Sequence, residues 1–230
     1  GSKAPGSGNR NQPVAIQTRA KDNYNNGIRL MGNLFAEVDF MPDLTFKTSF
    51  GLDHGRSWYY SMSKLSPEFS ETTGRNQFSE GASFSSRYVF TNTLNYRKTF
   101  LNVHNLTALI GSEFIHFGLG RSLSASRYDH NFEDDMNTWV LDGGSTKDMT
   151  NSSGWQGETA MFGLFGRLDY DYNNRYLLTA ILRRDGSSRF SDTNRYGYFP
   201  AVSVGWRISE ENFMQNVSLI DDLKFRIGYG

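Results

Sequence analysis

The side chains from which catalysis or metal binding would have to be built are few and poorly spaced for it. The sequence contains four histidines, His54, His104, His116 and His130. None belongs to a zinc-ligand pattern such as H-E-x-x-H, and there is no G-x-S-x-G elbow or phosphate-binding glycine loop. The acidic run at 133–135 lacks the alternating oxygen ligands of an EF-hand. We therefore expect no enzymatic activity, no metal site and no cofactor.

A dense group of charges lies in the sequence RRDGSSRF at 183–190. Its guanidinium groups, on Arg183, Arg184 and Arg189, are suited to bidentate contacts with carboxylates. Two interpretations follow. The arginines contact a bound solute, or they pair with carboxylates such as Asp169 on neighbouring strands.

Large aromatic side chains form a third candidate group. They are Trp58, Tyr59, Tyr60, Trp139 and Trp155. Flat aromatic faces can stack on sugar rings or pack under a partner protein. Packing of these rings within their own loops is the alternative interpretation.

Composition excludes several classes of protein. The chain has 24 basic and 24 acidic residues, so no net field favours nucleic acid or an anionic membrane surface. It has no cysteine, which excludes disulfide scaffolds, thiolate metal sites and cysteine nucleophiles. No apolar run reaches the roughly 18 residues that a membrane-spanning helix needs.

Alternation with a period of two predicts that the sequence forms mainly β-strands. In 30–40, the residues of one parity are almost all apolar, and the other parity includes Asn33, Glu37 and Asp39. The same pattern returns in 44–52, 88–96, 106–117, 162–172, 202–208 and 223–229. Met41-Pro42-Asp43 and Asn173-Asn174 are turn sequences between such segments. We predict about eight strands.

The connections between these strands alternate between short and long. Polar, aperiodic stretches near 61–82, 118–156 and 186–199 predict long loops, and residues 1–27 are predicted to be a linker. Short turns on one side and long loops on the other are typical of outer-membrane barrels. The fold class predicted is therefore all-β, an antiparallel transmembrane β-barrel segment over 28–230, with the long loops extracellular.

Two further patterns agree with this prediction. Tyrosines at 96, 170, 172 and 176 gather beside the short turns, where an interfacial girdle would lie. The opposite strand faces carry charges of both signs, which suits a hydrated barrel interior. These charges are on Glu37, Asp39, Lys47, Arg87, Arg97, Glu113, Arg167 and Arg226.

The sequence between 163 and 230 resembles the SusC/RagA family of TonB-linked outer-membrane proteins. The resemblance lies in RRDGSSRF at 183–190, YGYFPAVSVGWRISEE at 196–211 and LKFRIGYG at 223–230, in family order and spacing. NQPVA at 11–15 and the segment 32–53 extend it more weakly. The motif residues are Arg183, Arg184, Asp185, Gly186, Arg189, Phe190, Tyr196, Gly197, Phe199, Pro200, Gly205, Trp206 and Arg207. Because substrates differ across the family, this shared motif favours the structural interpretation of its arginines.

The resemblance implies a plugged barrel of the class with about 22 strands. It implies a cell outer membrane location in a Gram-negative bacterium and TonB-driven import of glycans or oligopeptides. The implied partners are a SusD-like surface lipoprotein, the TonB complex and outer-membrane lipid, and no nucleic acid. About eight strands cannot close such a barrel, so we expect the chain to be part of a longer protein.

Three alternatives remain open at this point. One is a simple TonB-dependent receptor without a lipoprotein lid, and another is a structural or adhesive outer-membrane barrel. The third is a soluble carbohydrate-binding module, in which the apolar strand faces would have to find an internal core. The sequence does not distinguish a glycan from a peptide as the solute.

Overall fold

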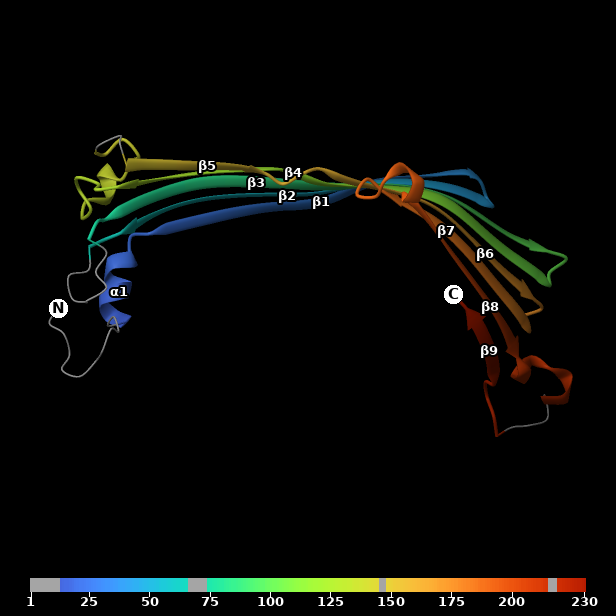
Figure 1. Cartoon of the computed structure of the whole chain (residues 1–230). Helices are drawn as coiled ribbons and strands as arrows, with labels where there is room; N and C mark the ends of the chain where they lie inside the picture. Colours follow the sequence, from blue (N-terminus) through green and yellow to red (C-terminus); the bar gives the residue numbers. More distant parts are fainter. Residues whose placement is uncertain (1–12, 66–73, 145–147, 215–218) are drawn as a thin grey trace. The chain divides into compact units, whose positions relative to one another are not determined.

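The computed structural model describes residues 13–65, 74–144, 148–214 and 219–230 and consists mainly of one antiparallel sheet (Figure 1). The elements are α1 (Pro13–Ala20), β1 (Tyr24–Met41), β2 (Leu44–Ser63), β3 (Gln77–Phe100), β4 (His104–Tyr128), β5 (Met149–Trp155), β6 (Thr159–Tyr172), β7 (Tyr176–Ser187), β8 (Tyr196–Arg207) and β9 (Lys224–Tyr229). The strand order is β1-β2-β3-β4-β6-β7-β8-β9, and β5 pairs with β4. Within the described ranges, no helix has the length and apolar character needed to cross a membrane.

Tight turns on one side of the sheet confirm the predicted hairpins. Asn173 and Asn174, between β6 and β7, have φ of 50° and 56°, and Leu101 and Asn102, between β3 and β4, have φ of 50° and 59°. A pair of residues with positive φ matches the right-handed twist of the flanking strands, and asparagine tolerates this conformation well. The connection from β8 to β9 contains two short helical turns, η4 (Ile208–Glu210) and η5 (Asn212–Met214).

The predicted loops are shorter in the structure, because the strands extend into them. The largest correction concerns 118–156, where β4 continues to Tyr128 and pairs with β5, the ninth strand. In the same way β3 begins at Gln77, within the loop predicted at 61–82. β7 runs to Ser187 and β8 starts at Tyr196, within the loop predicted at 186–199.

These corrections share a physical cause. β5 has the sequence MTNSSGW and is exposed along almost its whole length, so neither face produces an apolar alternation. Its backbone hydrogen bonds to β4 still make it a strand. The predicted linker at 1–27 is also wrong in detail, since it contains α1 and the start of β1.

The chain divides into two compact units, and β1 to β4 contribute residues to both. Unit 1 comprises residues 1–30, 54–86 and 118–157, and unit 2 comprises residues 31–53, 87–117 and 158–230. Each is described by itself below.

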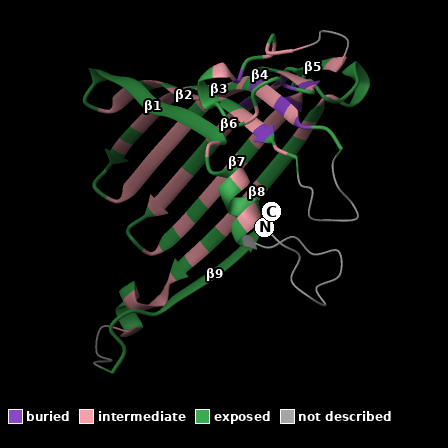
Figure 2. Cartoon of the chain, turned by 90° about the vertical axis from the view of Figure 1, so that its left-hand side faces the viewer, coloured by how far each residue is buried: buried purple, intermediate pink, exposed green. Residues whose placement is uncertain are grey.

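The described residues of unit 1 contain a small buried core. Met62 and Phe78 are almost inaccessible and Trp139 is 7% exposed, with Tyr60 and Leu141 packed against them. Arg127 is fully buried beside this core and its Nη1 donates a 2.6 Å hydrogen bond to the Leu141 carbonyl oxygen. These residues lie in the loop-bearing region where Figure 2 shows the buried segments.

Unit 2 has two chemically different faces, which follow from the strand register. One face, here called the apolar face, carries rows of directly paired residues. The row His104, Tyr172, Tyr176, Trp206 and Phe225 lies beside the tight turns, at what we call the turn end. The row Phe114, Phe162, Gly186 and Tyr196 lies beside the 188–195 loop, at the loop end.

Exposure in unit 2 is the reverse of that in a soluble protein. Along β8 the apolar-face residues are exposed, with Val202 at 48% and Val204 at 47%, whereas Ser203 and Gly205 are half-buried. The stripes along the strands in Figure 2 follow this alternation. Among the described residues of unit 2, no hydrophobic side chain is classed as buried. The soluble-module alternative requires an internal core for this face, and the described part of the unit has none.

Bare glycines allow aromatic rings to lie against the backbone. The Phe165 ring lies over Gly111, so that an added Cβ would overlap the ring and come within 2.9 Å of the Asn92 carbonyl oxygen. Gly111 and Phe165 are directly paired across β4 and β6, and the neighbouring pair is Ile110 and Gly166. At Gly166 the nearest atom to an added Cβ is 3.8 Å away, which is ordinary contact.

This contrast gives a matched pair of substitutions. Gly111→Ala should destabilise the sheet by about 1–3 kcal/mol, because both a ring and a backbone oxygen must move. Gly166→Ala should be close to neutral. Urea unfolding of the full-length protein in detergent, followed by tryptophan fluorescence, measures both. Equal stability of the two variants would contradict the close contact at Gly111.

Candidate functional site

The second face of unit 2, here called the polar face, contains most of the charges that we predicted to face a barrel interior. Glu37, Lys47, Arg97 and Arg167 line one depression of about 520 Å³, together with Asp169. Lys47 Nζ is 3.4 Å from a carboxylate oxygen of Glu37. A second depression of about 400 Å³ is lined by residues that include Arg167, Asp169 and Arg226. The polar face therefore offers both charge signs to a hydrated solute or to another protein segment.

Arg167 and Arg183 organise this face through ion pairs. Arg167 Nε donates to Asp169 at 2.6 Å, and Thr179 Oγ1 donates to the same carboxylate at 2.8 Å. Arg183 Nη2 donates to Glu113 at 2.8 Å and its Nε donates to Asp185 at 2.8 Å. The pairing of motif arginines with carboxylates is thus found for Arg183. The partner named from the sequence, Asp169, is wrong, since Arg167 on the same strand already binds it.

Arg184 lies on the opposite, apolar face. Its guanidinium carbon is 3.8 Å from the centre of the Tyr196 ring and 5.9 Å from that of Tyr198. Tyr196 also covers Gly186, where a Cβ would come within 2.5 Å of the ring. Alternating side chains explain why two adjacent arginines have unlike environments.

The remaining motif residues shape the ends of β7 and β8. Arg189 Nε donates to Thr159 Oγ1 at 3.3 Å, and Phe190 is exposed in the loop that follows β7. The Phe199 ring lies over Gly197. Pro200 pairs with Leu182, Gly205 with Leu177 and Arg226, and Arg207 with Lys224. All of these contacts are made within the chain, which fits the structural interpretation of the motif.

Glu211 forms a polar cluster at the turn end that sequence reasoning missed. It accepts hydrogen bonds from the Tyr176 hydroxyl at 2.7 Å and from Trp206 Nε1 at 3.1 Å. Arg175 donates to the same carboxylate at 3.3 Å. The hydrogen bond from Tyr176 holds the pKa of Glu211 below its ordinary value. No pattern in SEENFM indicated that this glutamate would be held by two aromatic residues.

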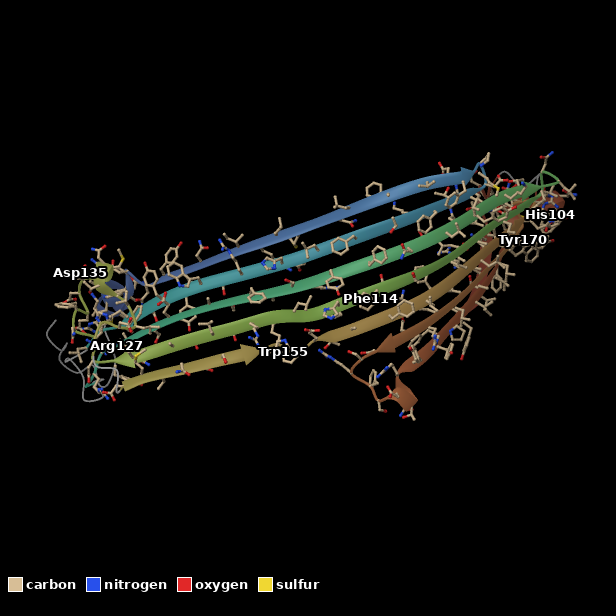
Figure 3. The ribbon with its side chains drawn as sticks, turned by 90° about the horizontal axis from the view of Figure 1, so that it is seen from above. His104, Phe114, Arg127, Asp135, Trp155 and Tyr170 are labelled. Carbon is tan, nitrogen blue, oxygen red and sulfur yellow. The ribbon has the colours of Figure 1, made fainter. Side chains whose placement is uncertain are left out.

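Aromatic side chains do gather at the turn end, as predicted. The Tyr172 and Tyr176 rings are stacked with centres 6.3 Å apart, and both are exposed on the apolar face. His104 lies beside Tyr170 (Figure 3), and their side chains share a 2.7 Å hydrogen bond. Amphipathic rings in this position are typical of a membrane interface.

The aromatic candidates of unit 1 are not equivalent. Trp58 and Tyr59 are exposed, and Trp155, at the end of β5, is 63% exposed. Trp58 packs against Tyr24 and Tyr60, and its Nε1 donates to Glu80 at 3.0 Å.

Trp139 and Tyr60 belong instead to the core of unit 1. Their rings meet edge to face, with centres 6.2 Å apart, and Trp139 Nε1 donates to the Glu133 carbonyl oxygen at 3.2 Å. Packing therefore accounts for Trp139 and leaves little of its surface to meet a solute.

Each carboxylate of the acidic run at 133–135 has a contact within the protein. Glu133 accepts a hydrogen bond from the Leu65 amide, Asp134 pairs with Lys64 at 2.9 Å, and Asp135 caps η1 (Met136–Thr138). Figure 3 places Asp135 among the side chains of this loop region. Among the described residues, no group of three or more histidine, aspartate or glutamate side chains is arranged to hold a metal ion.

A sheet with an exposed apolar face, a charged opposite face and tight turns at one end is a section of β-barrel wall. The chain belongs to the family described as "TonB dependent receptor-like, beta-barrel", whose profile matches residues 2–230. The resemblance to SusC and RagA is thereby confirmed.

Named relatives and solved structures agree with this family. TonB-dependent receptor P39 of Formosa agariphila is 32% identical over 96% of this chain and 21% of its own length. TonB-dependent receptor SusC of Bacteroides thetaiotaomicron is 56% identical over 66 residues, which is 29% of this chain and 7% of SusC. The structure of the RagAB peptide transporter matches with a TM-score of 0.76 and 26% identity, over 90% of this chain and 23% of that one.

These comparisons also show how much of its relatives' length the chain spans. It spans about a fifth of the length of the curated relatives that it matches over most of its own length. The relatives are named receptors and transporters, so the family is not one of enzymes. Family members are outer-membrane β-barrel proteins.

The Arg183 pairs predict a measurable coupling across strands. Arg183→Gln and Glu113→Gln should each lower the free energy of unfolding, and the double variant should lose about 1 kcal/mol less than their sum. A double-mutant cycle on urea unfolding of the full-length protein tests this. The pair Arg226→Gln and Glu113→Gln, which shares no contact, is the control and should be additive. If the changes in the free energy of unfolding were additive in both cycles, the proposed structural role of Arg183 would be wrong.

A second prediction concerns acid and the loop that follows β4. Arg75 donates two hydrogen bonds to Asp129, through Nε and Nη2, and holds the pKa of Asp129 below its ordinary value. A carboxyl whose pKa is lowered by folding stabilises the fold above its unfolded pKa, and this contribution is lost as pH falls through the lowered pKa. The backbone amides of 129–144 should therefore be protected from hydrogen exchange to a constant degree between neutral pH and about pH 4. This protection should decrease as the pH falls below about 4.

Hydrogen exchange corrected for the intrinsic pH effect measures this change. Asp129→Asn should give low protection at every pH, with no acid-dependent step. An unchanged step in this variant would assign the acid sensitivity to another carboxylate.

Proposed function

We propose that this chain forms a section of wall and the outer loops of a TonB-driven importer of glycans or oligopeptides in the outer membrane. The observation that carries the proposal is the exposed apolar face of unit 2, which a soluble protein could not leave in water. Family membership supports the class of importer, and in a barrel wall with an apolar outer band the polar face would line the interior.

The orientation of the wall follows from its connections. Outer-membrane barrels have short periplasmic turns and longer extracellular loops. We infer that the turn end faces the periplasm, and that the connections after β2, β4 and β7 lie outside the cell. The solute would meet the exposed Trp58 and Tyr59, near the end of β2, and Trp155, at the end of β5, because their aromatic faces are accessible there. Trp139 and Tyr60 would support them from the core.

The partners are part of the same proposal. The structural relative is named the RagAB peptide transporter, and SusC is 56% identical over 66 residues. Both favour a SusD-like lipoprotein that closes the outer opening, with the TonB complex supplying energy from the inner membrane. The mixed charges of the polar face fit an uncharged or weakly charged oligomeric solute better than a strongly charged one.

Native purification tests this directly. The full-length protein, tagged and extracted from outer membranes in mild detergent, should bring down a surface lipoprotein in near-equal amount. A tagged outer-membrane barrel of another class, purified in parallel, controls for adventitious association. Recovery of the barrel alone would favour a simple receptor without a lid.

A further inference from the structure

The apolar face of unit 2 is not uniformly filled. A depression of about 610 Å³ extends over β2, β3, β4, β6, β7 and β8, with Ile110, Leu164 and Leu182 among its lining residues. The register explains it. Ile110, Gly166 and Leu182 are directly paired in one row, and Gly166 has no side chain to fill the space between the other two. An open apolar channel between two large aliphatic side chains has the shape and chemistry to hold a hydrocarbon chain.

Arg184 and Tyr198 lie at the loop end of this depression. They are directly paired and both line it. Among the described residues that line the depression, Arg184 alone is charged, and the others are apolar, aromatic or uncharged polar residues. No carboxylate in the described part of the chain forms a salt bridge with it. Its Nε is buried and has no hydrogen-bond partner among the described residues. The contacts with Tyr196 and Tyr198 hold the guanidinium in place but do not neutralise it.

The height of Arg184 in the membrane can be estimated along β8. Trp206 at the turn end and Tyr196 at the loop end are ten positions apart, or about 33 Å at about 3.3 Å per residue. With a strand tilt of about 40°, this is about 25 Å along the membrane normal, which is the height of the apolar band between the two aromatic girdles of a barrel. Arg184 contacts the Tyr196 ring and so lies at the loop-side girdle, where lipid headgroups are found.

At the level of the lipid headgroups, a cationic side chain contacts phosphate groups and not acyl chains. We propose that the depression is a lipid-binding site, in which one acyl chain lies between Ile110 and Leu182 and a phosphate of the loop-side leaflet contacts Arg184. Charge-assisted hydrogen bonds from an arginine to phosphate are short and directional. The site rests on the membrane location proposed above and requires neither a lid lipoprotein nor transport.

Native mass spectrometry of the full-length protein in detergent tests the site with two lipids that differ only in the headgroup. The probes are dioleoylphosphatidic acid and dioleoylglycerol. Wild-type protein should bind the phosphatidic acid, and Arg184→Gln should bind it roughly five- to tenfold more weakly. Dioleoylglycerol should bind weakly and equally to both proteins.

Two further variants separate the chain contact from the charge contact. Gly166→Leu fills the depression and should weaken binding of both lipids, while Arg226→Gln removes a polar-face arginine and should change neither. Unfolding curves for each variant confirm that the barrel is intact. Unchanged phosphatidic acid binding by Arg184→Gln, or equal binding of both probes to the wild type, would overturn the site. Neither result depends on whether a lipoprotein co-purifies, so failure of the site and failure of the proposed function are distinguishable.

Discussion

Strict alternation of side chains across a hydrogen-bonded sheet is the constraint on which this structure depends. In the strands between β1 and β9, the two edge strands of the sheet, backbone groups are hydrogen-bonded to neighbouring strands on both sides, so the side chains are free to differ completely between the two faces. One face is apolar and exposed, and the other carries ion pairs and hydroxyl contacts. A barrel wall has little need of a buried core, because in this class of protein lipid covers the outer side and hydrated polar contacts fill the other.

Unit 1, in contrast, contains a small buried core. Unit 1 buries Met62, Phe78 and Trp139, and it places Arg127 and the Asn76 side chain in the same region. Asn76 imitates a strand partner, since its amide group donates to the His130 carbonyl oxygen and its oxygen accepts from the His130 amide. Such reciprocal bonds order a long connection without regular secondary structure. The two units thus reach stability by different routes within one chain.

The sequence predicted unit 2 well and unit 1 poorly, for a physical reason. Period-two alternation marks strands whose two faces have different surroundings. For this reason the turn at Asn173 and the last strand, predicted at 223–229 and found at Lys224–Tyr229, were located closely. The strand predicted at 202–208 was also found, but β8 begins earlier, at Tyr196. β5 has two polar faces and leaves no such pattern. Partners within the polar face were also beyond prediction, because Glu113 and Arg183 meet only through the register of three strands, whereas Asp169 and Glu113 look equally available in the sequence.

The connection between β5 and β6 has a consequence for how such proteins diversify. β4 pairs with β5 at 121–127 and with β6 at 104–117, and the short 156–158 segment, with Gly157 at φ 72°, separates the two ladders. Each ladder keeps its own register. The 129–148 connection can therefore change in length without shifting a single residue of the β6–β7 pairing, so that loop length and the strand register of the wall can vary independently.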